Sequence, residues 1–156
     1  MEHERKYIHS GQLFVGVRPT IISTVLGSCI AVCLYDEKMK ISAMNHYLLP
    51  LWNNEGLASP KYGNIAIAKL VEGMEAVGCE RRNIVAKIFG GASPNNFDGS
   101  KGMLVGEKNV QLAKSMLEQY KIKIVASDVG GNRGRKIALE TDSGRIILKY
   151  LQKTQT

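Results

Sequence analysis

Leu26-Gly-Ser-Cys-Ile-Ala-Val-Cys-Leu-Tyr35 is the stretch of sequence that decides the fold. A glycine turn leads into a run in which every second residue from Ile30 onward is a large aliphatic one, a pattern typical of a strand with one core-facing side. A polar loop at 36–40 separates this run from a second expected strand at 41–49. A connection this short predicts an antiparallel hairpin.

The sequence on either side of this hairpin predicts a layered domain. Further strands are expected at 13–17, 21–24, 83–89 and 122–129, and in a closing hairpin at 136–150. Ser59-Pro60 predicts the start of a helix that stops at Gly78, and a second helix is expected over about 106–120. Residues 1–12 are expected to be a flexible or edge lead-in. The fold class that follows is α+β, a layered sandwich of mixed, mostly antiparallel strands with two main helices on one face.

Length and composition limit the class of protein. With 156 residues, of which 44% are hydrophobic and 22% charged, the chain is expected to form one soluble globular domain over 1–156. There is no run of about 20 apolar residues and the first ten residues are polar, so we expect a cytoplasmic protein without membrane insertion.

The positive charges are spread along the chain rather than gathered in one block. A formal net charge of +7 then indicates solubility and attraction to an acidic partner. Nucleic-acid binding is not expected, because no basic helix is interleaved with aromatic residues and only 6% of residues are aromatic.

Three cysteines cannot all pair within one chain, and the sequence predicts free thiols. If 29–33 is extended, the Cα atoms of Cys29 and Cys33 lie roughly 13 Å apart, beyond the reach of a disulfide. Cys33 in mid-strand and Cys79 after a helix-ending glycine are interpreted as buried structural residues. No metal site is predicted, because a structural zinc site needs four closely spaced Cys or His ligands.

Cys29 and His46 are the candidate catalytic pair. Gly27-Ser28-Cys29 places a thiol directly after a glycine turn, where it can be exposed beside backbone amides. A nucleophilic thiol also needs a base or a positive neighbour that lowers its pKa. His46 is the only histidine outside the polar lead-in, and the hairpin brings it to the same end as Cys29. On pattern alone, a buried structural cysteine and a hydrogen-bonded histidine remain the alternative.

Two glycine-containing loops have competing interpretations. Gly90-Gly-Ala-Ser93 follows a strand but matches neither common phosphate-binding motif. The loop at 128–135 is either an anion site built on Arg133 and Arg135 or a solvated turn, of which the turn is favoured.

Four motifs together resemble one family. They are Thr24-Val-Leu-Gly-Ser-Cys-Ile-Ala-Val-Cys-Leu34, Met44-Asn-His-Tyr-Leu-Leu-Pro50, Lys87-Ile-Phe-Gly-Gly-Ala-Ser93 and Asp128-Val-Gly-Gly-Asn-Arg-Gly-Arg135, joined by Ser100-Lys-Gly-Met103 and Gly106-Glu-Lys-Asn-Val110. In this order, over about 13–151, they are similar to the CheD family of chemoreceptor glutamine deamidases.

The resemblance implies a cysteine-hydrolase domain related to deamidating bacterial toxins. Its activity would convert selected glutamines of methyl-accepting chemotaxis receptors to glutamate, with no metal or organic cofactor. Cys29 would be the nucleophile and His46 its base. The third catalytic member falls on Thr24 or Ser23. Only one of the two can face the imidazole, because a one-residue slip on a strand turns a side chain to the other face, and Thr24 is favoured.

The resemblance also implies how the reaction would be supported and regulated. Backbone amides near Gly27 to Cys29, among them that of Ser28, helped by the Gly90-Gly91 turn, would hold the oxyanion. The phosphatase CheC would be a binding partner. The alternative function is a chemotaxis adaptor that acts mainly by binding CheC and receptors.

Overall fold

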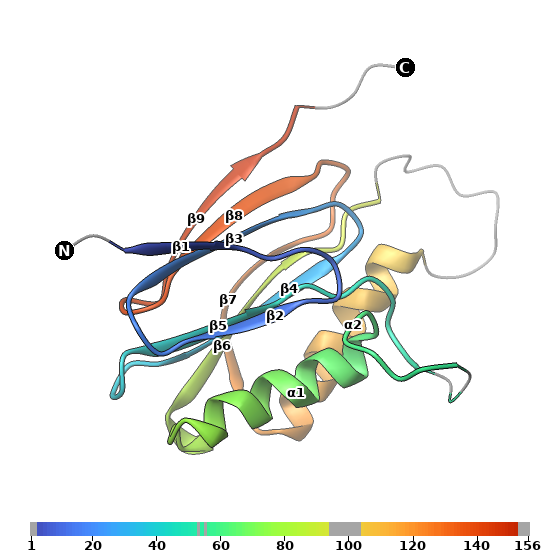
Figure 1. Ribbon diagram of the computed structural model, residues 1–156. Coiled ribbons are helices and arrows are strands. Elements are labelled where there is room, and N and C mark those ends of the chain that lie inside the picture. Colours follow the sequence, from blue (N-terminus) through green and yellow to red (C-terminus); the bar gives the residue numbers. More distant parts are fainter. Residues whose placement is uncertain (1–2, 53, 55, 94–103, 153–156) are drawn as a thin grey trace.

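The computed structural model describes residues 3–52, 54, 56–93 and 104–152. Within these ranges the chain forms two β-sheets and two α-helices (Figure 1). No described helix is both long and apolar enough to span a bilayer. The expected loop beyond Ser93 and the motif at 100–103 lie outside the described residues.

The two sheets have four and five strands. The four-stranded sheet has the order β1 (Glu4–Tyr7), β3 (Thr20–Leu26), β8 (Arg135–Glu140) and β9 (Arg145–Tyr150). The five-stranded sheet has the order β2 (Leu13–Gly16), β5 (Ile41–Asn45), β4 (Ile30–Asp36), β6 (Ile84–Gly90) and β7 (Lys123–Val129). The pairs β1–β3 and β6–β7 are parallel and the other pairs are antiparallel. This confirms the expected mixed, mostly antiparallel α+β architecture.

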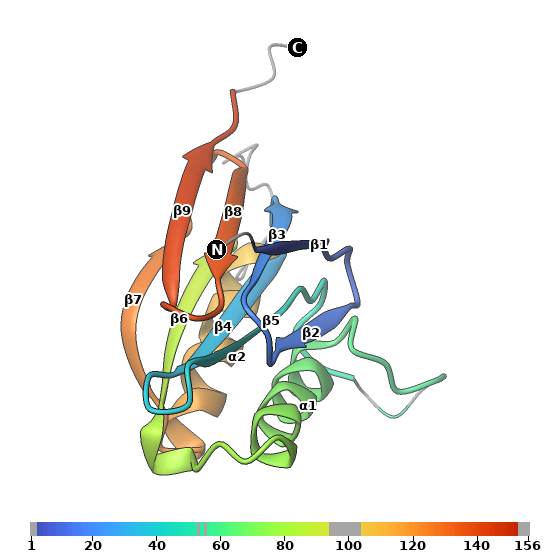
Figure 2. The same cartoon turned by 60° about the vertical axis from the view of Figure 1, so that its left-hand side comes forward.

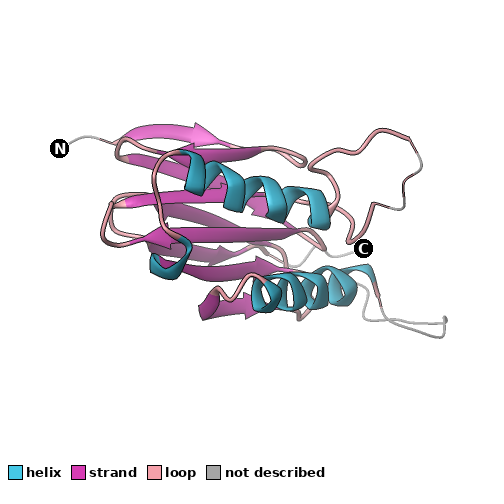
Figure 3. Cartoon of the chain, turned by 90° about the horizontal axis from the view of Figure 1, so that it is seen from below, coloured by secondary structure: helices cyan, strands magenta, loops and turns pink. Residues whose placement is uncertain are grey.

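The elements form three layers. Helices α1 (Gly63–Ala76) and α2 (Val105–Gln119) cover one face of the five-stranded sheet (Figure 3). The opposite face packs against the four-stranded sheet (Figure 2). One apolar core therefore lies between helices and sheet, and a second lies between the two sheets.

Strand β4 is buried on both faces, so the expectation of one core-facing side was wrong. Ile30, Val32 and Leu34 belong to the core under the helices. Ala31 and Cys33 belong to the core between the sheets. In the sequence, the small or weakly polar residues at these alternate positions resemble the pattern of a solvent-facing side, although both faces of the strand are covered.

The strand expected at 41–49 ends at Asn45. The side-chain Oδ1 of Asn45 accepts the Val32 amide at 2.8 Å, in place of a backbone carbonyl. The backbone of His46 bonds to the segment before β2, where its amide donates to Gln12 and its carbonyl accepts from Gly11. An asparagine side chain that competes with the ladder thus ends the strand earlier than the apolar pattern predicts.

Helix α1 begins at Gly63 rather than at Ser59-Pro60. The Lys61 carbonyl accepts the amides of Leu48 and Leu49, which keeps the chain extended through Tyr62. Ser59 caps only a short turn, because the pairing with 48–49 outweighs its local preference for a helix start. The expected stop at Gly78 is confirmed, with φ at 103°.

The other expected elements are confirmed with small shifts in their ends. α2 covers the predicted second helix, and β8 and β9 form the closing hairpin. The lead-in contains β1, which lies at the edge of the four-stranded sheet beside β3. Ile8, directly after β1, is fully buried in the inter-sheet core.

Candidate active site

Cys29 lies in a turn directly before β4 and is half-buried. Its side chain packs against the core between the two sheets. Cys33 and Cys79 are buried, and all three are free thiols. Cys29 is therefore the most accessible of the three sulfur atoms.

The Cys29 turn is locked against the turn that follows β6. Gly91 donates its amide to the Cys29 carbonyl at 2.9 Å, and Ala92 donates to the Gly27 carbonyl at 3.0 Å. Gly90 has a φ of 108°, and a Cβ there would lie 2.2 Å from the Cys29 carbonyl oxygen. Only glycine allows this close approach of the two backbones.

The turn directs its carbonyl groups inward, and this fixes where its amides point. The carbonyls of Gly27, Ser28 and Cys29 accept bonds from Ala92, Asn109 and Gly91, respectively. In a trans peptide the N–H points away from the C=O of the same unit. The amides of Ser28 and Cys29 therefore face the opposite side, where no backbone carbonyl of the described residues accepts from them and where the Cys29 amide contacts its own sulfur. Two adjacent outward amides are the kind of donor pair that oxyanion holes use.

The Gly91 amide is not part of this donor set. It donates to the Cys29 carbonyl, so Gly91 holds the Cys29 turn in place. Gly90 supports the same turn through its close approach to Cys29.

His46 follows β5 and is buried, with 5% of its surface exposed. The pairs Cys33–Met44 and Ile30–Tyr47 share one register, which places His46 opposite Ala31 on the inter-sheet face. Cys29 packs toward the same face, directly before Ile30, whose partner Tyr47 directly follows His46. No hydrogen bond joins the thiol to the ring in the part of the chain that the structure describes.

Thr24 reaches His46 from the other sheet. Its Oγ1 lies 2.7 Å from Nδ1 of His46 and donates its proton to the Ile8 carbonyl at 2.8 Å. A hydroxyl has one proton to give, so Nδ1 must be the donor to Thr24. Nε2 is then unprotonated and able to accept a proton. Ser23 alternates to the opposite face of β3, so the structure brings Thr24, and not Ser23, to the ring.

Burial keeps both candidate catalytic groups neutral. It lowers the pKa of His46 to about 4, with a smaller contribution from nearby His9. Burial also raises the pKa of Cys29, partly offset by the hydrogen bond from its own amide. A nucleophile next to a base would be expected to have a lowered pKa, but the pKa of Cys29 is raised, because no cation among the described residues compensates for desolvation. The arrangement fits a thiol that loses its proton to a neutral base during attack.

Neither Asn109 nor Asn45 was predicted from the sequence as a residue of the site. Asn109 on α2 is fully buried and donates to the carbonyls of Ser28 and Leu48, both at 3.0 Å. The sequence signal for Asn109 was a polar residue on the apolar face of a predicted helix. Asn45, directly before His46, accepts the Val32 amide on its side-chain oxygen, and its signal was an amide inside an otherwise apolar strand.

The loop at 128–135 borders a cavity of about 410 Å³ that is also lined by Tyr150. Arg135 is buried and forms an ion pair with Asp128 at 2.8 Å. It also donates to the carbonyls of Gly90 and Gly130. With its donors committed in this way, Arg135 supports the loop and the Gly90 turn, which agrees with the turn interpretation of this segment.

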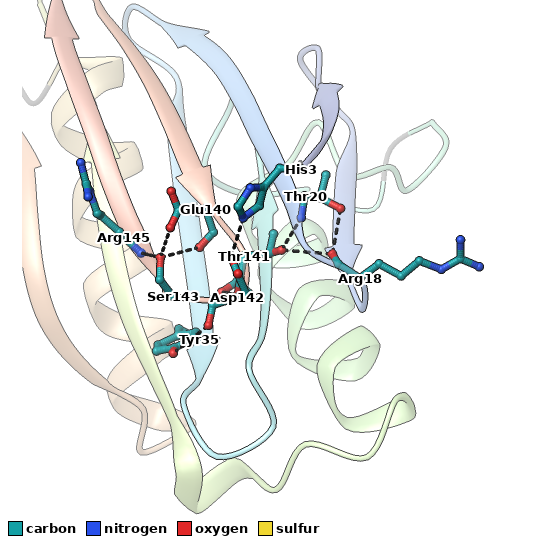
Figure 4. A network of polar contacts seen from close by, with 10 residues as sticks. His3, Arg18, Thr20, Tyr35, Glu140, Thr141, Asp142, Ser143 and Arg145 are labelled. Atoms are coloured by element: carbon teal, nitrogen blue, oxygen red, sulfur yellow. Dashed lines mark hydrogen bonds and ion pairs between the residues drawn. The ribbon is translucent and has the colours of Figure 1, made fainter. Parts of the chain in front are cut away.

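Among the described residues, one cluster of possible metal ligands lies away from this site, at the turn between β8 and β9 (Figure 4). His3, Glu140 and Asp142 each offer a ligand atom, and these atoms lie within 4.8 Å of one another. His3 and Asp142 already form a contact of 2.9 Å. The cluster adjoins Thr20, at the start of β3, whereas Cys29 lies beyond the end of that strand. It joins the N-terminal segment to the hairpin and takes no part in the Cys29 site.

Comparison with known proteins identifies the family. The family described as "CheD chemotactic sensory transduction" matches residues 48–150. The chain is 74% identical to a protein of Sulfurimonas denitrificans named "Probable chemoreceptor glutamine deamidase CheD", over 99% of both chains. The chain belongs to the CheD family.

Other CheD proteins are similar over most of their length. A relative with the same name from Trichlorobacter lovleyi is 46% identical over 92% of this chain and 89% of its own. "Probable chemoreceptor glutamine deamidase CheD 1" of Anaeromyxobacter dehalogenans is 44% identical over 93% of this chain and 84% of its own. The CheD family expected from the sequence motifs is thus confirmed.

Proposed function

We propose that this chain is a chemoreceptor glutamine deamidase in which Cys29 is the nucleophile, His46 the base and Thr24 the residue that orients the base. The names of the CheD relatives support the activity. The observation that carries the residue assignment is the Thr24–His46 hydrogen bond on the face toward which Cys29 packs.

In the proposed reaction, Nε2 of His46 takes the thiol proton while sulfur attacks the side-chain amide carbon of a receptor glutamine. The amides of Ser28 and Cys29 bind the oxyanion that forms. The imidazolium protonates the departing nitrogen, which leaves as ammonia, and a thioester remains on Cys29. His46 then accepts a proton from water, which attacks the thioester, releases glutamate and restores the thiol.

The test is glutamine-to-glutamate conversion in the cytoplasmic part of a methyl-accepting chemotaxis receptor, followed by ammonia release and peptide mass spectrometry. We expect Cys29→Ala to abolish both signals, because it removes the attacking sulfur. Cys33→Ala and Cys79→Ala are the matched controls and should retain activity. An active Cys29→Ala protein would refute the nucleophile assignment.

The proposed chemistry uses no metal, so a chelator should leave the rate of ammonia release unchanged. Loss of activity with EDTA that zinc restores would overturn this part of the proposal. The His3 cluster gives the matched control, since Asp142→Asn changes the cluster without touching the Cys29 turn.

CheC binding, a cytoplasmic location and kinship with deamidating toxins are further parts of the proposal, supported by the family resemblance. A CheC pull-down compared with receptor deamidation by the same preparation separates the enzyme from the adaptor alternative. An adaptor would bind CheC equally well as wild type or Cys29→Ala and would release no ammonia in either form.

A further inference from the structure

Asn109 connects the two segments that carry Cys29 and His46. Its Nδ2 donates one hydrogen bond to the Ser28 carbonyl and another to the Leu48 carbonyl, both at 3.0 Å. Ser28 directly precedes Cys29, and Leu48 lies two residues after His46. A single planar amide group therefore spans the gap between the two catalytic segments.

This contact replaces a missing pair of backbone bonds. The last backbone pair between the segments joins Ile30 and Tyr47, with N···O distances of 3.1 and 2.9 Å. In an antiparallel ladder the next bonded pair would join Ser28 and Leu49. The Leu49 amide instead donates to Lys61, and the Leu49 carbonyl accepts from Gly63. Asn109 stands where the next pair of ladder bonds would form, and it continues the connection at the point where the reaction would take place.

The connecting side chain is itself held firmly. Asn109 is fully buried, and its main-chain carbonyl accepts the Tyr47 hydroxyl. One turn earlier, Gly106 packs so closely that a Cβ there would lie 2.5 Å from the Gly91 carbonyl oxygen. Helix α2 is thus docked on the nucleophile turn and on the segment after His46 at the same time.

Burial of this amide carries a cost. Oδ1 of Asn109 is buried and has no hydrogen-bond partner among the described residues. A buried polar atom without a partner lowers stability, and an apolar side chain of the same size would avoid that cost. The benefit of asparagine at this position therefore lies in its two N–H donors.

We propose that Asn109 is a positioning residue, which sets the distance and direction between the Cys29 thiol and the His46 ring without touching the substrate. The inference rests on the proposed deamidase function. A displacement of about 1 Å between reacting groups can reduce a rate about 100-fold. Loss of the connection should therefore act on turnover rather than on receptor binding.

The test replaces Asn109 with leucine, which has a similar size and no donor. We expect kcat for ammonia release to fall at least about ten-fold while KM for the receptor changes less than about two-fold. Leu117→Ala is the matched control, because Leu117 is fully buried on the same helix but belongs to the core under the helices. This variant should lower the thermal midpoint and keep its kcat.

Asn109→Ser provides a second variant, with one donor and a smaller side chain. It should fold at the assay temperature by circular dichroism and still lose kcat. Wild-type kcat in either folded Asn109 variant, or an equal loss of kcat in Leu117→Ala, would overturn the inference. Wild-type and Cys29→Ala proteins are assayed alongside. If they do not differ, the deamidase proposal itself fails and removes the basis for a positioning role.

Discussion

At the scale of single residues, the Thr24 hydroxyl decides which nitrogen of His46 can act as a base. Its proton goes to the Ile8 carbonyl, so it accepts from Nδ1 and leaves Nε2 unprotonated. Thr24→Val keeps the shape and removes this acceptor. We expect kcat to fall about ten-fold or more, because the ring is free to adopt the other tautomer. Steady-state ammonia release measures this.

Ser23→Ala is the control for Thr24→Val, because Ser23 lies on the other face of β3. It should keep kcat within about two-fold of the wild type. The reverse order, with a larger loss in Ser23→Ala, would show that the strand has the other register and that Thr24 does not orient the base.

The neutral state of His46 makes a prediction about acid stability. Its pKa is about 4 in the folded protein, below the value of about 6.5 in an unfolded chain. The fold therefore favours the neutral ring. This stabilisation is complete above pH 6.5 and is lost as the pH falls toward 4. Urea unfolding over this range should show up to about 1.4 kcal/mol of lost stability per pH unit, reduced in His46→Gln. An equal pH dependence of the unfolding free energy in wild type and His46→Gln would contradict this prediction.

The same burial predicts how the Cys29 thiol reacts. Because burial raises its pKa, the rate of alkylation by iodoacetamide should keep rising with pH above 8. A plateau below pH 7 would reveal a stable thiolate–imidazolium pair in the free protein. Cys33 is the internal control, since burial raises its pKa to about 12 and it should label more slowly.

At the scale of elements, two backbone turns form the site by locking together. Gly90→Ala should lower the free energy of unfolding by on the order of 2 kcal/mol or more, because a Cβ would meet the Cys29 carbonyl at a positive φ. Gly27→Ala is the matched control in the neighbouring turn, where a Cβ would meet nothing within 4 Å. Denaturant unfolding compares the two. Similar losses of unfolding free energy in Gly90→Ala and Gly27→Ala would mean that the backbone at Gly90 can shift to make room for a Cβ.

At the scale of the whole molecule, residues 3–12 connect the two sheets. β1 pairs with β3 in one sheet, and Gly11 and Gln12 then bond to His46 beside the other. Ile8 is fully buried between these contacts. Ile8→Ala should cost about 2–4 kcal/mol of stability, as a large-to-small change in a core. Neighbouring Tyr7 is 43% exposed, and Tyr7→Ala should cost much less. Equal costs would place Ile8 outside the core.

The sequence by itself determined those features that depend on neighbours along the chain. The turn at Gly27, the amphipathic helix over 106–120 and the closing hairpin follow from local periodicity and glycine punctuation. The hairpin also brought Cys29 and His46 to one end, because a short connection allows little else. Family membership followed from several motifs in a fixed order.

The tertiary structure alone decided the parts that depend on distant partners. Thr24 meets His46 across 22 positions and two sheets, and Asn109 meets Ser28 across 81 positions. The early end of β5 and the late start of α1 have the same origin, since Asn45 and Lys61 bond to other segments. Burial of both faces of β4 depends on a sheet formed from the two ends of the chain. Local pattern cannot reveal such partners, because a polar side chain has the same sequence signature whether its hydrogen bond is near or far.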